Sequence, residues 1–147
     1  MIKVRATRSI AALMLSACAV AGAGVVATGT PAAAAVYDCN TTYKWRKGTN
    51  LYILLPWDSR GTSLCYLSPG DSGRDVAALQ YTLLMCYGRD IDVDGEFGSQ
   101  TKAALQYAQR QEGIAADGYY GVESLNALRW QPRKISDGEP MGVCVNK

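Results

Sequence analysis

The side chains in this sequence that could carry out acid–base chemistry are carboxylates, because its 147 residues include no histidine. That composition excludes Ser-His-Asp and Cys-His nucleophile systems and His-ligated zinc hydrolysis for this sequence. A glycosidase needs only two carboxylates, one with a raised pKa. The available acids are Asp92, Asp94, Glu96 and Asp117. We expect Asp94 and Asp117 to shape turns and the other two to face solvent, so no enzyme is predicted.

Calcium binding is an alternative use of the same acids. Asp90, Asp92 and Asp94 precede Gly95 in the Asp-x-Asp-x-Asp-Gly order that opens an EF-hand loop. The twelfth position of such a loop needs a bidentate Glu. Thr101 stands there instead. A calcium site at these three acids therefore stays an alternative, and we expect no metal and no cofactor.

Four cysteines remain once Cys18, which lies in the N-terminal apolar run, is set aside. An even number in an exported chain indicates two disulfides, and four cysteines allow three pairings. We favour Cys39–Cys65, which would staple an N-terminal β segment, and Cys86–Cys144, which would tie the tail to the first helix. The chain has no Cys-x-x-Cys spacing, which disfavours zinc.

One phrase occurs twice, with the form Asp-Gly-x-aromatic-Gly-x-x-Ser/Thr. The copies span residues 94–101 and 117–124, which are 23 positions apart. Asp-Gly predicts a tight turn in which Gly takes a positive φ and the Asp carboxylate accepts loop N–H groups. We expect the aromatics to enter the core, the second glycines to allow close backbone approach, and the Ser/Thr hydroxyls to bond near the exposed N–H groups of a helix start. These positions are Phe97 and Tyr120, Gly98 and Gly121, and Thr101 and Ser124.

Three helices are predicted to carry these turns. Ser72 is expected to cap the first helix with Asp75 as its capping-box partner. Its buried face would include Val76, Leu79, Leu83 and Cys86 or Tyr87, and Gly88 would end it. The second helix begins at Gly98 or Ser99, buries Ala104, Leu105 and Ala108, and stops at Gly113. The third begins near Val122, turns Leu125 and Leu128 inward and ends before Pro132.

Short strands are predicted before the helices, where Thr, Tyr, Ile, Leu and Trp are frequent. They cover residues 40–45, 51–55 and 63–67, with turns at 47–50 and 56–61. The predicted order is a signal peptide (1–35), a β-rich extension (36–66), a helical domain (67–130) and a polar tail (131–147) held by a disulfide.

The first 35 residues have the basic, apolar and small-residue regions of a secretory signal peptide. A membrane span over the apolar run is the disfavoured reading, and lipid attachment at Cys18 is a minority alternative. The mature chain would carry twelve basic and thirteen acidic residues. That balance argues against a nucleic-acid binder.

Some fifteen positions between Leu67 and Leu128 agree in order and spacing with a known pattern. They include Gly70, Gly73, Val76, Leu79-Gln80 and Leu83, both Asp-Gly-x-aromatic-Gly turns, Gln109, and Gly113-Ile114. This segment resembles the peptidoglycan-binding domain family found beside bacterial cell-wall hydrolases. Ala108 departs from it, since the family usually carries an aromatic before the Gln, and Tyr107 or Tyr87 could fill the space. The resemblance implies a mainly α fold, a compact three-helix bundle, to which this chain adds a small N-terminal β-hairpin extension.

The resemblance implies that the domain binds the bacterial cell wall. Together with the signal peptide and the lack of a catalytic set, it leads us to expect a secreted, non-catalytic, monomeric module that binds peptidoglycan through glycan or stem peptide. Such a surface needs exposed aromatics, amides and a few charges. The candidate contacts are Gln80, Tyr81, Arg89, Gln106, Tyr107 and Tyr119. Tyr119 is the preferred contact. It lies beside Tyr120, and only one of these two tyrosines can easily point inward. The alternative function is a secreted protein-binding or inhibitory domain that uses the aromatic β extension.

Overall fold

The computed structural model describes residues 37–147. The predicted signal peptide and Cys18 lie outside the described residues. The three predicted helices are present: α1 (Arg74–Tyr87), α2 (Ser99–Gln111) and α3 (Val122–Ala127). The strands are β1 (Tyr37–Asp38), β2 (Thr41–Lys47), β3 (Leu51–Trp57), β4 (Cys65–Tyr66), β5 (Arg129–Trp130), β6 (Arg133–Lys134) and β7 (Val145–Asn146). The part of the fold that is not helical is therefore larger than the single small hairpin that the sequence predicts.

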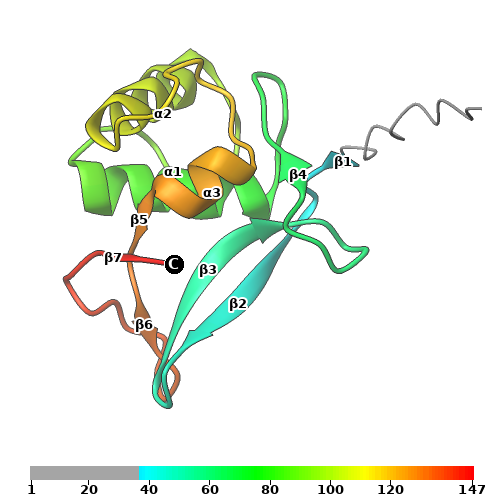
Figure 1. Cartoon of the computed structure of the whole chain (residues 1–147). Coiled ribbons are helices and arrows are strands. Elements are labelled where there is room, and N and C mark those ends of the chain that lie inside the picture. Colours follow the sequence, from blue (N-terminus) through cyan, green and yellow to red (C-terminus); the bar gives the residue numbers. More distant parts are fainter. Residues whose placement is uncertain (1–36) are drawn as a thin grey trace, which may run out of the picture. The chain divides into compact units, whose positions relative to one another are not determined.

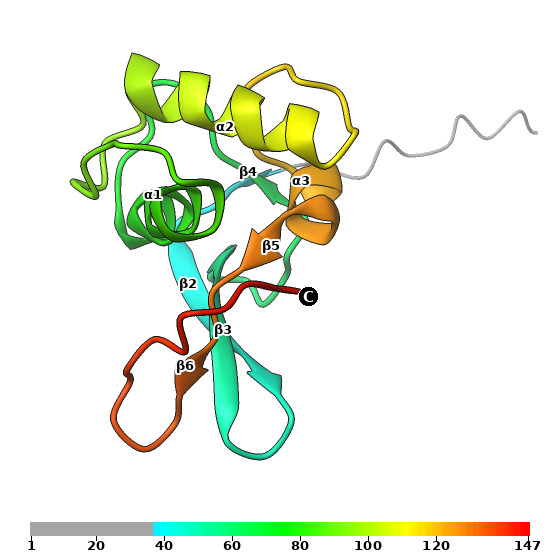
Figure 2. The same cartoon turned by 90° about the vertical axis from the view of Figure 1, so that its left-hand side faces the viewer.

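Helix α1 lies at the centre of these elements. It contacts α2 on one side and the β2–β3 hairpin on another. Figure 2 looks nearly along α1 and shows it between α2 above and the hairpin below. Figure 1 shows the short C-terminal strands running beside the hairpin. Within residues 37–147, no helix combines the length and the apolar character needed to cross a bilayer.

The buried face of α1 follows the predicted spacing. Val76, Leu79, Leu83 and Tyr87 belong to one core cluster. The helix ends at Gly88, which is left-handed with φ 60°. Side chains at this spacing share one face of a helix, so α1 presents a continuous apolar stripe to its neighbours.

The predicted capping box at the start of α1 is wrong. Gly73 occupies the N-cap position, and no side chain caps the helix. The reason is that the chain before α1 pairs with the first repeated loop: Ser72 forms a bridge with Glu96, and the Gly73 N–H donates to the Gly95 carbonyl at 2.9 Å. Asp75 is buried instead of capping, and burial raises the pKa of its carboxyl.

The hairpin packs one of its faces into the core. Strands β2 and β3 pair antiparallel, and Ile53 and Leu55 of β3 are fully buried. Strand β3 runs through Pro56 to Trp57, so the turn predicted from Pro56 begins later. Asp58 holds that turn, because its Oδ1 accepts the Arg60 N–H at 2.8 Å.

The C-terminal residues form more structure than the polar tail that the sequence predicts. Strand β6 pairs with β3, which makes a three-stranded sheet in the order β2-β3-β6. Strand β7 pairs antiparallel with β5, so the end of the chain returns to the residues that follow α3. These pairings join segments far apart in sequence, which local residue preferences cannot reveal.

Both favoured disulfides are present. Cys39 is bonded to Cys65, beside the parallel pairing of β1 with β4. Cys86, on the last turn of α1, is bonded to Cys144, next to β7. The two cysteines of the second disulfide are 58 residues apart in the sequence. This disulfide therefore fixes the return of the C-terminal segment onto α1.

The hydroxyl of Tyr87 connects α1 to the end of α2 and to strand β5. The hydroxyl donates to Glu112 Oε1 at 2.9 Å and accepts the Arg129 backbone N–H at 2.7 Å. The Arg129 side chain reaches the same Glu112 oxygen at 2.8 Å. Burial raises the pKa of Tyr87 to about 12, and the hydrogen bond to Glu112 acts in the same direction.

We expect the stability of the protein to fall between about pH 10 and pH 12. In that range the unfolded chain releases the Tyr87 proton while the folded chain retains it, so unfolding becomes easier as the pH rises. Urea unfolding of the wild type and Tyr87→Phe at pH 8 and pH 11.5 measures this. The stability difference between the two proteins should shrink at the higher pH, and a constant difference would contradict the assignment.

Candidate functional site

The first repeated loop is built around the buried side chain of Gln80. Gln80 Nε2 lies 2.8 Å from Asp94 Oδ1, 3.0 Å from the Glu96 carbonyl and 3.0 Å from Thr101 Oγ1. Gln80 Oε1 accepts the Gly95 N–H at 2.8 Å. A backbone N–H can only donate, which fixes the orientation of the Gln80 amide. One side chain of α1 thus holds the whole turn that precedes α2.

The second loop repeats this arrangement with Gln109 of α2. Gln109 Nε2 lies 3.0 Å from Asp117 Oδ1, 2.9 Å from the Tyr119 carbonyl and 3.1 Å from Ser124 Oγ. Gln109 Oε1 accepts the Gly118 N–H at 2.9 Å. We call each Gln with its loop partners a glutamine clamp. The clamps were not predicted from the sequence, although Gln80 and Gln109 both stand in the family pattern.

The clamps confirm some roles expected of the repeated phrase. Gly95 and Gly118 have φ values of 78° and 74°, so these turns favour glycine. Asp94 and Asp117 each accept the N–H two residues on, at 2.8 and 2.9 Å. Phe97 and Tyr120 are buried in the core.

Other expected roles of the phrase are wrong. Thr101 and Ser124 do not cap the helix starts, because their hydroxyls meet the clamp amides and lie near the loop carbonyls. A side chain at Gly98 would meet no described atom within 4 Å, so no close approach explains that glycine. At Gly121 the expectation holds, since an added Cβ would lie 2.7 Å from the Tyr66 ring.

Both loops are also joined to the extended segment before α1. Phe97 N–H donates to the Asp71 carbonyl at 2.9 Å, and Gly70 N–H donates to the Phe97 carbonyl at 3.0 Å. Tyr120 and Leu67 exchange both backbone hydrogen bonds at 3.0 Å. Residues 67–73 therefore connect the two clamped loops to each other and to α1.

One of the two tyrosines in the second loop reaches the surface. Tyr120 is fully buried, whereas Tyr119 is 46% exposed. The Lys102 ammonium lies 4.9 Å from the Tyr119 ring centroid. Gln106 lies one helical turn beyond Lys102, and both side chains approach Gly118. Tyr119, Gln106 and Lys102 form one patch, which we call the loop-2 face.

Arg89 and Tyr107 form a separate pair. The Arg89 guanidinium lies 4.5 Å from the Tyr107 ring centroid, and both residues are partly buried. Gln80 differs from the other predicted contacts, because it is 1% exposed and committed to the first clamp. Its amide holds the loop and has no surface to offer a ligand.

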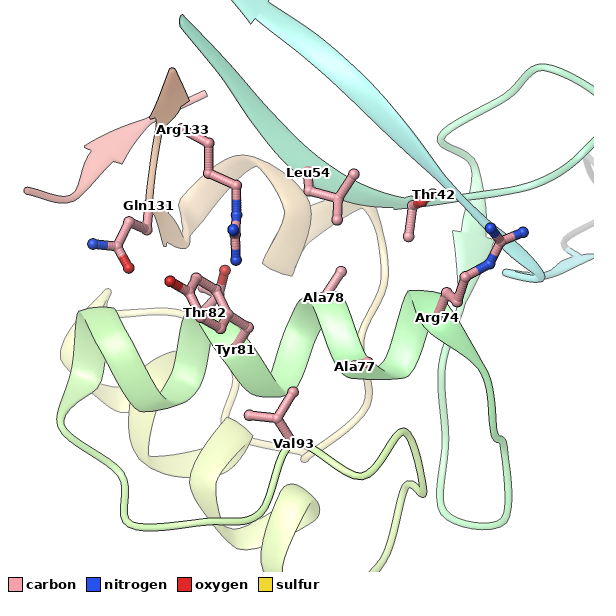
Figure 3. Close-up of a pocket in the computed structure, with 10 residues that line it drawn as sticks. All are labelled: Thr42, Leu54, Arg74, Ala77, Ala78, Tyr81, Thr82, Val93, Gln131 and Arg133. Atoms are coloured by element: carbon pink, nitrogen blue, oxygen red, sulfur yellow. The ribbon is translucent and has the colours of Figure 1, made fainter. Parts of the chain in front are cut away.

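Tyr81 lines a pocket between α1 and the hairpin. The cavity has a volume of about 270 Å³. Figure 3 shows Arg133 reaching from β6 toward Tyr81 on α1, with Leu54 and Thr42 of the hairpin on the same side. The Arg133 guanidinium lies 4.3 Å from the Tyr81 ring centroid. We call this the hairpin pocket.

The hairpin also presents aromatic side chains to solvent. Tyr43 stacks on Trp57 with ring centroids 4.6 Å apart, and Trp45 packs edge-on against Tyr43. Tyr43 and Trp45 are 45% and 37% exposed. The Lys147 ammonium lies 4.9 Å from the Trp45 ring centroid, so the chain end reaches this face.

The carboxylates of the repeated loops are engaged in turn geometry. Hydrogen bonds from the Glu96 N–H and from Gln80 lower the pKa of Asp94, which is opposite to the shift a general acid needs. Asp92 and Glu96 are exposed as expected. Among residues 37–147, no three His, Cys, Asp or Glu side chains are grouped to hold a metal.

Comparisons with known proteins identify the segment that contains both clamps. A family model described as "Putative peptidoglycan binding domain" matches residues 72–128. The chain is 42% identical over 71 residues to the N-acetylmuramoyl-L-alanine amidase CwlM of Mycobacterium tuberculosis, covering 48% of this chain and 18% of the amidase. It is 41% identical over 64 residues to the zinc D-Ala-D-Ala carboxypeptidase of Streptomyces albus G, covering 42% of this chain and 25% of that protein.

A solved structure also matches part of the chain. The crystal structure of the SleB N-terminal domain is 34% identical, with a TM-score of 0.41, and the match covers 44% of this chain and 88% of that one. The chain spans a quarter or less of each of the two curated relatives above. The family resemblance is confirmed for residues 72–128.

We expect Gln80→Ala to lower the free energy of unfolding by about 2–3 kcal/mol, because it leaves the buried Gly95 N–H without an acceptor and removes the amide donor from the Thr101 hydroxyl. Gln109→Ala should have a similar effect. Gln106→Ala is the matched control on α2, since its half-buried side chain makes no hydrogen bond within residues 37–147, and it should cost less than about 0.5 kcal/mol. Urea unfolding measures the free energy of unfolding of the three variants. Equal losses in all of them would contradict the stabilising role given to the clamp glutamines.

Proposed function

Because a family model for a peptidoglycan-binding domain matches residues 72–128, we propose that the protein is a secreted, non-catalytic module that binds bacterial cell-wall peptidoglycan. The match of residues 72–128 to the family model is the main support for this proposal. The relatives named above are an amidase and a carboxypeptidase, and the matched segment is a small part of each. Binding, and not hydrolysis, is thus the property we transfer to this chain.

Export to an oxidising compartment is supported by two features. Disulfides form and persist outside the reducing cytosol, and this chain contains Cys39–Cys65 and Cys86–Cys144. The sequence pattern of residues 1–35 is that of a secretory signal peptide. We therefore propose that the module works in the cell wall, as a monomer, without a cofactor.

A non-catalytic role is supported by the chemistry of the available side chains. The sequence contains no histidine. Asp94 and Asp117, the acids repeated in both loops, accept hydrogen bonds that hold the turns. The pKa of Asp94 is lowered by the Glu96 N–H and by Gln80, which keeps it ionised and unable to protonate a leaving group.

The loop-2 face is the surface we propose for wall contact. An exposed aromatic ring offers a flat apolar surface to a sugar ring, and the neighbouring Lys102 and Gln106 offer hydrogen-bond donors. Clamping of the loop by Gln109 holds the Tyr119 backbone in place, because the Tyr119 carbonyl and N–H are both bonded within the clamp. The ligand then meets a preorganised ring. Tyr81, Arg89 and Tyr107 remain further proposed contacts.

A second candidate function is favoured by the exposed hairpin aromatics. Tyr43, Trp45 and Trp57 form a contiguous group on β2 and β3. Exposed aromatic groups of this kind are enriched at protein interfaces. In this alternative the chain is a secreted protein-binding or inhibitory domain.

We expect Tyr119→Ala to weaken retention on insoluble peptidoglycan by about tenfold, which corresponds to loss of one aromatic contact. Tyr43→Ala is a matched control, because Tyr43 and Tyr119 are 45% and 46% exposed. Depletion of the oxidised protein from solution by increasing amounts of peptidoglycan gives the apparent affinity of each variant.

The same experiment separates the two functions. Retention that depends on Tyr119 and not on Tyr43 supports wall binding through the loop-2 face. Unchanged retention of Tyr119→Ala would remove Tyr119 as a contact. Flow-through of the wild-type protein would contradict wall binding altogether, and capture of a secreted protein that is lost in Tyr43→Ala would support the second function.

A further inference from the structure

The hairpin pocket is formed only partly by the family segment. Its α1 side comes from residues 72–128, whereas Thr42 and Leu54 come from the hairpin and Gln131 and Arg133 from the chain after β5. Figure 3 shows these side chains facing α1 from the opposite side of the cavity. The segments that this chain adds to the family domain thus create a cavity of about 270 Å³.

The α1 side of the pocket, which we call its floor, is apolar and made of small side chains. Ala77 and Ala78 form it, Leu54 faces them from the hairpin, and Val93 adds a further apolar side chain to the lining. Two alanines side by side leave room next to the helix backbone, so the pocket accepts methyl-sized groups. A bulky ligand does not fit a cavity of about 270 Å³, which is at the small end of ligand pockets.

The charge on the pocket lining is entirely positive. Arg74 and Arg133 line it, and none of the lining residues is acidic. Within residues 37–147 the Arg133 side chain donates one hydrogen bond, to the Gly138 carbonyl at 3.1 Å, and its guanidinium carbon lies 4.3 Å from the Tyr81 ring centroid. A guanidinium has five N–H donors in a fixed fork that matches a carboxylate. The contacts with Tyr81 and with the Gly138 carbonyl keep the guanidinium at the cavity.

Gln131 contributes an unpaired hydrogen-bond acceptor to the pocket lining. Its side chain is 5% exposed, and its Oε1 has no hydrogen-bond partner in the described part of the chain. Buried side-chain oxygens are normally paired, so an unpaired one on a pocket wall indicates where a ligand donor would bind. A peptide N–H is such a donor.

From these features we propose that the hairpin pocket binds the end of a short peptide with small aliphatic side chains and a free carboxylate. The carboxylate pairs with Arg133, a peptide N–H donates to Gln131 Oε1, and the methyl groups rest on Ala77 and Ala78. The proposal rests on the proposed function, because in the cell wall such an end is supplied by the stem peptide. It gives this chain a second contact, separate from the loop-2 face.

The direct probe is N-acetyl-D-alanyl-D-alanine, with its C-terminal amide as the matched ligand and N-acetyl-L-alanyl-L-alanine for handedness. We expect titration of the ¹⁵N-labelled protein to shift the Gln131 side-chain amide and the backbone amides of residues 77–82. The C-terminal amide should bind at least about tenfold more weakly, because it lacks the charge that Arg133 recognises.

Arg133→Gln should weaken binding of the acid by at least about tenfold and abolish the preference over the amide. Arg110→Gln is the control, because Arg110 is an exposed arginine on α2 away from the pocket lining. If Arg133→Gln fails to fold, Ala77→Leu provides a second test: the larger side chain fills the cavity and should abolish binding while leaving Arg133 in place.

The outcomes distinguish this inference from the proposed function. Dipeptide binding that is lost in Arg133→Gln and Ala77→Leu supports the inference. Absence of dipeptide binding, equal binding of acid and amide, or shifts confined to the loop-2 face would overturn it, even where the protein is still retained on peptidoglycan. Loss of retention on peptidoglycan with intact dipeptide binding would instead contradict the proposed wall function.

Discussion

The pairing of a buried glutamine amide with a glycine-containing turn is the interaction on which the rest of the structure depends. Gln80 and Gln109 are almost completely buried, so their amides must be paired inside the protein. In each clamp Nε2 has two hydrogens for three nearby oxygens, so one hydrogen is shared, and Oε1 accepts one glycine N–H. The clamp hydrogen bonds thus fix the turn geometry together with the buried aromatic and the start of the next helix.

The additions to the family segment build on this framework. Residues 67–73 bond to both loops, the hairpin and the C-terminal strands pack around α1, and the two disulfides hold these additions in place. The rigid loops and α1 present two different surfaces. The loop-2 face offers an exposed aromatic ring, and the hairpin pocket offers guanidinium groups over an apolar floor.

Features with a short-range cause could be predicted from the sequence. Apolar spacing gave the buried face of α1, and Asp-Gly gave both turns with Gly95 and Gly118 at positive φ. The role of Gln80 could not be predicted from the sequence, because a glutamine on a helix is usually exposed and the partners of Gln80 lie 14 to 21 residues away. The prediction that Ser72 caps α1 is wrong for a similar reason, since Ser72 pairs with Glu96, which lies far from it in the sequence. The hairpin pocket joins residues from four segments, which no local pattern contains.

Hydrogen exchange of the Gly95 and Gly118 amides tests the dependence of each turn on its glutamine, because each amide donates to one clamp glutamine. In Gln80→Ala, measured under conditions where the protein remains folded, Gly95 should lose protection while Gly118 keeps it, and Gln109→Ala should give the reverse. Protection of Gly95 that is unchanged in Gln80→Ala would show that the turn holds without its glutamine and would contradict the role given to the clamps.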